Sequence, residues 1–119
     1  MTLVDTSVWV DHLRGGDTQL ARLLHEGEVL CHPLVIEELA LGRLPRREEI
    51  LELLSILPKA TQASHEEFME FVKRRRPQGQ GIGAIDAHLM ISALLSRAKL
   101  WTRDKRLDRA AAKIGIQTQ

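Results

Sequence analysis

The sequence predicts an α/β protein in which a parallel sheet is covered by helices on both faces. Short apolar runs alternate with longer segments of helical spacing along the whole chain, a pattern typical of such sheets. The length of 119 residues suits one domain and is too short for two ordinary ones. A hydrophobic fraction of 44%, set against 28% charged residues, is typical of a soluble globular protein. We therefore expect a single domain over residues 1–119.

One expected strand and two expected helices open the chain. The apolar run Thr2–Asp5 ends at an acid and predicts the strand. Thr6 or Ser7 can cap a helix that runs to residue 13, before a pair of glycines. Asp17 or Thr18 can cap a second helix, which ends at a further glycine at position 27.

A strand and two more helices follow. Val29–His32 is the second short strand-like run. Pro33 suits the first position of a helix and Gly42 the position after its end, so the residues between them predict a helix. A further helix is expected over Arg46–Leu57, where Pro58 ends it.

The middle of the chain contains a weak strand candidate and a well-marked helix. The strand candidate is Lys59–Ala63. Ser64 and Glu67 form a capping-box pattern, which predicts a helix that runs to about Arg76.

The last third alternates again between helix and strand. The Gly-rich loop Gln78–Gly83 precedes Ala84–Ala98, which is apolar nearly all round and predicts a buried helix. Leu100–Thr102 predicts a short strand, Lys105–Ile114 a last helix and Ile116–Thr118 a final strand.

Composition restricts the classes of function. Cys31 is the only cysteine, which excludes an intrachain disulfide and favours a cytoplasmic location. The sequence contains no signal-peptide pattern, no run of about 20 apolar residues and no zinc-ligand spacing. The net charge of +1 predicts no partner, although basic clusters such as Arg43, Arg46 and Arg47 are compatible with a phosphate-bearing one.

Two acids directly follow expected strands. Asp5 ends the first strand, and Asp104 follows the strand Leu100–Thr102. Ligands of open parallel sheets bind beyond the carboxyl ends of the strands, where both acids fall. The alternative interpretation is that each acid only caps the helix after it.

A third acid, Asp86, lies among apolar neighbours. Ile82, Leu89 and Met90 are one helical turn away, and an ionised carboxylate there is costly unless it is paired or bound to a metal. The alternative is a favourable position in the first turn of the helix, where the helix dipole stabilises an anion.

Two glutamates lie in the helix that follows Pro33. Glu38 shares a face with Leu34, Val35 and Leu41, and the helical wheel separates it poorly from Glu37. Periodicity therefore leaves open which of the two faces the end of the sheet.

Gathering several carboxylates in one place is unfavourable without a cation. A pair about 4 Å apart repels by roughly 1 kcal/mol in water and by several times that near a protein surface. A site built of such groups implies a hard cation, Mg²⁺ or Mn²⁺, which prefers oxygen ligands. Such an ion assists phosphodiester hydrolysis, because it binds the phosphate and activates a water.

Four segments resemble the motifs of one family. VDTSVWVDHL, EELALG, GIGAIDAHL and LWTRDKRL are similar to segments of the PIN-domain ribonucleases, and especially of the VapC toxins of type II toxin–antitoxin systems. The resemblance runs from Leu3 to about Gly115, with the motifs in the family's order.

The resemblance assigns roles to individual residues. The acids that match those of the family's site are Asp5, Glu38, Asp86 and Asp104. Three of them, Asp5, Asp86 and Asp104, are the expected metal ligands, and Glu38 completes the pocket. Ser7 matches the family's small hydroxyl residue, and we expect Ser7 and Thr102 to orient a water or a phosphate. The residues left unassigned are Asp11, Glu37, Asp108, His12 and His88, which we expect to be surface or ion-paired groups.

The resemblance also implies a fold and partners. The fold is a three-layer α/β/α sandwich with a central, mostly parallel sheet. The activity is Mg²⁺-dependent endonucleolytic cleavage of RNA, tRNA in many relatives, with Mn²⁺ as a plausible substitute. A homodimer is implied, as is inhibition by a VapB-type antitoxin that presents an arginine to the acidic pocket.

Three alternatives stay open. A signalling receiver domain also binds Mg²⁺ at strand ends, but it needs an acceptor aspartate near mid-chain, and Ile56–His65 contains none. A PIN-like domain could bind RNA or a protein without cutting. Within the nuclease interpretation, a structure-specific DNA nuclease is the nearest alternative.

Overall fold

Three short parallel strands form the sheet at the centre of the molecule. The structure, a computed structural model, describes residues 1–118. The strands are β1 (Thr2–Val4), β2 (Val29–Leu30) and β3 (Lys99–Trp101), in the order β2-β1-β3. In register, Leu3 is opposite Leu30 on one side and Leu100 on the other. The expected parallel sheet is therefore confirmed.

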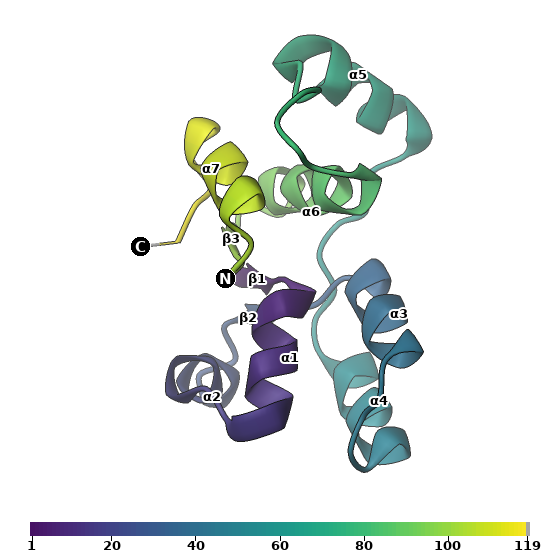
Figure 1. Cartoon of the computed structure of the whole chain (residues 1–119), viewed down its shortest axis with the longest axis vertical. Coiled ribbons are helices and arrows are strands. Elements are labelled where there is room, and N and C mark those ends of the chain that lie inside the picture. Colours follow the sequence, from purple (N-terminus) through teal and green to yellow (C-terminus); the bar gives the residue numbers. More distant parts are fainter. Residues whose placement is uncertain (119) are drawn as a thin grey trace.

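Seven helices surround this sheet in the described residues. They are α1 (Thr6–Gly15), α2 (Thr18–His25), α3 (Pro33–Leu41), α4 (Arg47–Ile56), α5 (His65–Arg75), α6 (Ala84–Leu95) and α7 (Lys105–Lys113). Figure 1 shows α5, α6 and α7 above the strands and α1 to α4 below them. This arrangement is the three-layer α/β/α sandwich that the sequence predicts.

The core lies where α6 packs against β1 and β3. Leu3 and Val4 are fully buried, because β1 is the central strand and is covered on both faces, and Leu100 of β3 is fully buried beside them. The buried residues of α6 are Ala87, Leu89, Met90, Ile91, Ser92 and Ala93. Burial on this scale confirms that the apolar segment after the Gly-rich loop is an interior helix.

Several expected elements are shorter than their apolar runs. The candidates Lys59–Ala63 and Ile116–Thr118 are each reduced to one parallel bridge, Cys31 with Lys59 and Leu100 with Gln117. The long helix ends at Leu95 instead of residue 98, because Arg97 adopts a positive φ of 52° and turns the chain toward β3. Each strand of the sheet is only two or three residues long, so a longer candidate segment finds a partner for only part of its length.

The first helix begins differently from the expectation. Its N-cap is Asp5, so the prediction that Thr6 or Ser7 caps it is wrong. Asp5 makes no side-chain capping hydrogen bond, because its carboxylate accepts hydrogen bonds from two hydroxyl groups instead. The predicted caps Asp17 and Ser64 are confirmed, since they accept from the amides of Leu20 and Glu67.

The expected domain, residues 1–119, includes Gln119, which lies outside the residues that the structure describes. Within residues 1–118, no helix combines the length and apolarity needed to cross a membrane.

Candidate active site

Asp5 is buried at the carboxyl end of the central strand. Asp5 is only 7% exposed. Ser7 Oγ and Thr102 Oγ1 each donate to Asp5 Oδ2 at 2.7 Å. Two hydrogen bonds to one oxygen fix the orientation of this carboxylate.

Asp104 lies on the turn between β3 and α7, beside Asp5. Its backbone N–H donates to Thr102 Oγ1 at 3.0 Å, so the same hydroxyl that binds Asp5 also holds this turn. Asp104 Oδ1 accepts from the amides of Arg106 and Leu107 and caps α7. The capping interpretation is therefore correct for one oxygen of Asp104, and Oδ2 makes no hydrogen bond within residues 1–118.

Glu38 approaches the same end of the sheet from α3. Its Oε1 accepts from Thr6 Oγ1 at 2.6 Å, across 32 residues of sequence. Glu38 is half-buried, whereas Glu37 is exposed. The choice that the helical wheel left open is therefore made by tertiary packing of α3 against α1.

Asp86 lies in the first turn of α6 and is half-buried. Burial raises the pKa of this carboxyl, and the charges of Asp5, Asp104 and Glu38 raise the pKa further, against a lowering effect of the Gly83 amide. The Gly83 N–H reaches Asp86 Oδ2 at only 3.4 Å, a long hydrogen bond. Asp86 is thus a carboxylate whose ionised form is disfavoured by three other acids.

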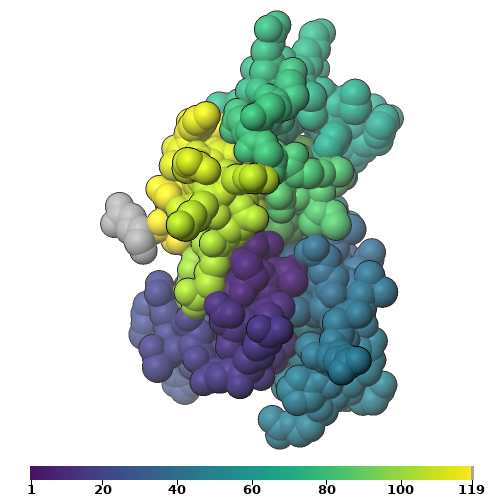
Figure 2. Space-filling view, viewed as in Figure 1, coloured from purple at the N-terminus to yellow at the C-terminus, as the bar shows by residue number. Residues whose placement is uncertain are grey.

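The four acids come from four separate elements. Asp5 follows β1, Glu38 lies on α3, Asp86 begins α6 and Asp104 begins α7. In Figure 2 the purple N-terminal segment touches both the yellow-green segment around β3 and the blue segment that contains α3. These elements meet at the carboxyl ends of β1 and β3, which is where ligands of parallel sheets bind.

The donor atoms fit a hard cation. Asp5 Oδ1, Asp86 Oδ1 and Asp104 Oδ2 accept no hydrogen bond from the described residues, so each aspartate keeps one oxygen for a ligand. Carboxylate oxygens suit Mg²⁺ and Mn²⁺. Among residues 1–118, however, no three acidic, His or Cys side chains already stand at the spacing of metal ligands.

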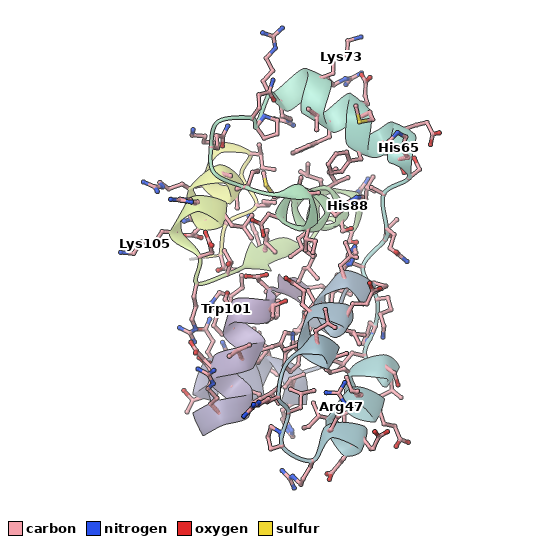
Figure 3. All side chains as sticks on the ribbon, turned by 45° about the vertical axis from the view of Figure 1, so that its right-hand side comes forward. Arg47, His65, Lys73, His88, Trp101 and Lys105 are labelled. Carbon is pink, nitrogen blue, oxygen red and sulfur yellow. The ribbon has the colours of Figure 1, made fainter. Side chains whose placement is uncertain are left out.

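The residues left unassigned by the sequence have structural contacts. Asp11 pairs with Arg103, Asp108 accepts from Gln117, and His12 accepts from the Asp17 amide. His88 packs against Phe68, with ring centroids 4.6 Å apart, between α5 and α6 (Figure 3). Among these contacts only that of Asp11 is an ion pair, and His88 is half-buried instead of lying on the surface.

Sequence reasoning missed one residue next to the site. Arg103 pairs with Asp11 and Asp17, lies over the Trp101 ring and donates its backbone N–H to Ser7 Oγ at 3.0 Å. It joins the turn that carries Asp104 to α1 and α2. The only sequence signal was its place in a basic segment, because both acidic partners lie more than 80 residues away.

The sequence matches the PIN domain family over residues 2–113. The chain belongs to this family. Ribonuclease VapC32 of Mycobacterium tuberculosis, from strains CDC 1551 / Oshkosh and H37Rv, is 52% identical over 117 residues. That alignment covers 98% of this chain and 94% of the mycobacterial protein.

A solved structure is also similar. The crystal structure of PAE2754 from Pyrobaculum aerophilum matches with a TM-score of 0.60 and 20% identity, over 92% of this chain and 78% of that one. At this identity the likeness concerns the fold alone. It agrees with the three-layer arrangement and the parallel sheet described above.

Proposed function

We propose that this chain is a metal-dependent endoribonuclease and the toxin of a VapBC-type toxin–antitoxin pair. The family match and the 52% identity to a protein named Ribonuclease VapC32 support the ribonuclease and toxin assignment. The observation that supports the mechanism is geometric: Asp5 and Asp104 follow the adjacent strands β1 and β3 and share the Thr102 hydroxyl, and Glu38 is hydrogen-bonded to Thr6, the residue after Asp5. Burial raises the pKa of Asp86, and the charges of these three acids raise it further. Repulsion between these carboxylates destabilises the folded protein, and a bound cation would remove that repulsion.

The proposed metal ligands are Asp5, Asp86 and Asp104, with Glu38 completing the pocket. Bound Mg²⁺, for which Mn²⁺ is a plausible substitute, would supply positive charge to the scissile phosphate and lower the pKa of the attacking water. Ser7 and Thr102 hold the Asp5 carboxylate through Oδ2, which leaves Oδ1 without a hydrogen bond from the described residues. Thr6 plays the same part for Glu38.

Two partners belong to the proposal. A VapB-type antitoxin would inhibit the enzyme by presenting an arginine, since a guanidinium neutralises the same carboxylates that hold the metal. A homodimer is also proposed, with a candidate surface on α3 and α4, where Leu41, Leu53 and Ile56 are 90%, 51% and 74% exposed. We place the protein in the cytoplasm, where an RNA substrate is available and a free Cys31 stays reduced.

RNA cleavage in the presence and absence of EDTA tests the proposed mechanism. We expect Mg²⁺-dependent cleavage by the wild type, none in EDTA, and a loss of at least about 100-fold in Asp5→Asn, which removes a ligand and keeps the shape. Glu38→Gln should also lower the rate. Its neighbour provides a matched control: Glu37→Gln changes the same kind of side chain at an exposed position and should cleave as the wild type does.

Two results would contradict the proposal. Undiminished cleavage by a folded Asp5→Asn protein would remove Asp5 from the mechanism. Binding of RNA without cleavage in any divalent cation would favour the binding-module alternative instead.

A further inference from the structure

A pocket opens beside Glu38 and Thr6. It has a volume of about 140 Å³ and lies between α1, α3 and the loop that joins α3 to α4. α1 contributes Thr6, Leu13 and Arg14, α3 contributes Glu38, and the loop contributes Arg43 and Leu44. This volume is roughly ten times the minimum that admits one water, so the pocket can take a larger group.

The pocket combines two cations with an apolar wall. Arg14 and Arg43 are exposed, and within residues 1–118 neither takes part in an ion pair. By contrast, Arg103 is engaged by two aspartates. Two uncompensated guanidinium groups beside an acidic centre are suited to a bound anion.

The loop that forms one wall is held in place. Arg47, at the start of α4, donates one guanidinium nitrogen to the Ala40 carbonyl and another to the Gly42 carbonyl, the latter at 3.2 Å. Figure 3 shows Arg47 near α3 and α4, which it joins. The pocket is therefore built before any ligand arrives, which limits the entropy lost on binding.

We propose that this pocket is a subsite for the nucleotide next to the scissile phosphodiester of an RNA substrate. Arg14 and Arg43 bind the backbone phosphate of that nucleotide, and its base packs on the aliphatic side chains, chiefly Leu13 and Leu44. Glu38 and Thr6 stand at the boundary between the subsite and the catalytic acids. The inference rests on the proposed nuclease function, since it needs a substrate whose scissile phosphate lies at those acids.

The charges favour a polyanion as the occupant. Arg14 and Arg43 line the pocket without an acidic partner among the described residues, so the pocket itself favours anionic groups over the arginine of a polypeptide, which the acids beside it would bind. An RNA strand brings alternate phosphates and bases, which match the alternation of cations and apolar side chains. The experiment below therefore distinguishes RNA binding at this pocket from binding of a polypeptide.

RNA binding by a non-cleaving protein tests the subsite. The probe is a fluorescein-labelled oligouridylate of about ten nucleotides, and Asp5→Asn is the background, measured by fluorescence anisotropy with Mg²⁺ present. We expect Arg14→Ala and Arg43→Ala each to weaken binding by about tenfold, the scale of one charged hydrogen bond. Each should lower the slope of log affinity against log salt by about 0.7.

A matched control uses an arginine outside the pocket. Arg75 is exposed on α5 and lines a separate groove with α6. Arg75→Ala should bind the oligouridylate as the parent protein does. Circular dichroism and thermal unfolding verify that each variant is folded, and Arg14→Gln and Arg43→Gln replace any alanine variant that is not.

A small phosphodiester separates the subsite from the catalytic acids. Bis(p-nitrophenyl) phosphate has no neighbouring nucleotide, so we expect the Arg14 and Arg43 variants, with Asp5 intact, to hydrolyse it at the wild-type rate. On RNA they should show a raised KM with little change in kcat. A folding defect or a general electrostatic effect would lower the rates on both substrates.

Two results overturn the subsite without touching the nuclease proposal. One is unchanged RNA affinity in the Arg14 and Arg43 variants, whether or not they lose binding of a partner polypeptide. The other is an equal loss on bis(p-nitrophenyl) phosphate. Failure of the nuclease proposal has a different signature, because the wild type would then bind RNA without cleaving it in any divalent cation.

Discussion

Thr102 connects two of the acids through one hydroxyl group. It donates to Asp5 Oδ2 and accepts from the Asp104 amide, at 2.7 and 3.0 Å, while it is only 7% exposed. The two acids that follow β1 and β3 are thus positioned by a residue that carries no charge. A threonine at the end of a short strand gives no sequence signal of this double role.

Removing that hydroxyl tests its role. Thr102→Val keeps the shape but leaves the Asp104 N–H without an acceptor, so we expect the free energy of unfolding to fall by about 1–3 kcal/mol. RNA cleavage should fall roughly 10–100-fold, because Asp5 loses a partner that orients it. Urea denaturation and a single-turnover cleavage assay measure the two effects. Wild-type cleavage by this variant would show that the orientation of Asp5 does not depend on Thr102, and Thr61→Val, at an exposed position, is the control.

Asp86 illustrates the conflict between stability and function at one residue. Its pKa is raised by burial and then by three acids, so in the metal-free protein its charge opposes folding. In EDTA at neutral pH, Asp86→Asn should stabilise the protein by about 1 kcal/mol, a value that allows for screening of a half-exposed group. Thermal unfolding measures this gain. Added Mg²⁺ should stabilise the wild type and not the variant. The variant should also lose RNA cleavage. A variant that is less stable than the wild type in EDTA would contradict the argument.

At the scale of elements, α3 brings Glu38 to the site and depends on an unusual N-cap. His32 Nδ1 accepts from the Leu34 amide at 3.0 Å, and the side chain is fully buried. Burial lowers the pKa of His32, and the charge of His88 lowers it further. Pro33 and Gly42 bound the helix as the sequence predicts, but the capping histidine was interpreted only as the end of a strand.

This cap predicts a dependence of stability on pH. Because the pKa of His32 is lower in the folded than in the unfolded state, the unfolded chain binds more protons below the ordinary pKa of 6.5. The stability contributed by neutral His32 is therefore complete above that pH and is lost as the pH falls, by up to about 1.4 kcal/mol per unit. Urea denaturation in EDTA at about pH 7.5 and pH 5.5 measures the loss. His32→Asn keeps a capping oxygen that does not titrate, so its loss should be smaller; an equal loss would rule out His32 as the cause.

The strands show how far local pattern determines an element. The apolar runs at the start and near the end of the chain become β1 and β3. The candidates Lys59–Ala63 and Ile116–Thr118 each make only one bridge, and the first, KATQA, has no large apolar residue. A strand needs a partner along its full length, and the partner strands here are two or three residues long.

At the scale of the whole molecule, three of the exposed large apolar residues lie on α3 and α4. Exposure of the large apolar side chains of Leu41, Leu53 and Ile56 to water costs free energy, and burial in a dimer would remove that cost. We expect wild-type protein to sediment as a dimer and Ile56→Asp to sediment as a monomer, because a charge in an apolar interface is costly. Met69→Asp, on α5, is the control, since Met69 is also half-exposed but lies outside the surface. Equal masses for wild type and Ile56→Asp would contradict this choice of surface.

The sequence by itself determined the class of fold, the order of the main elements and the family. Those features depend on apolar periodicity, on Pro, Gly and Ser at helix ends, and on motifs that are each local in the chain. Which of Glu37 and Glu38 turns inward, that Asp5 binds hydroxyls instead of capping its helix, and that Arg103 joins Asp11 to Asp17 were decided only by tertiary structure. The physical reason is that each depends on groups far apart in the sequence, which meet only after the strands have paired and the helices have packed.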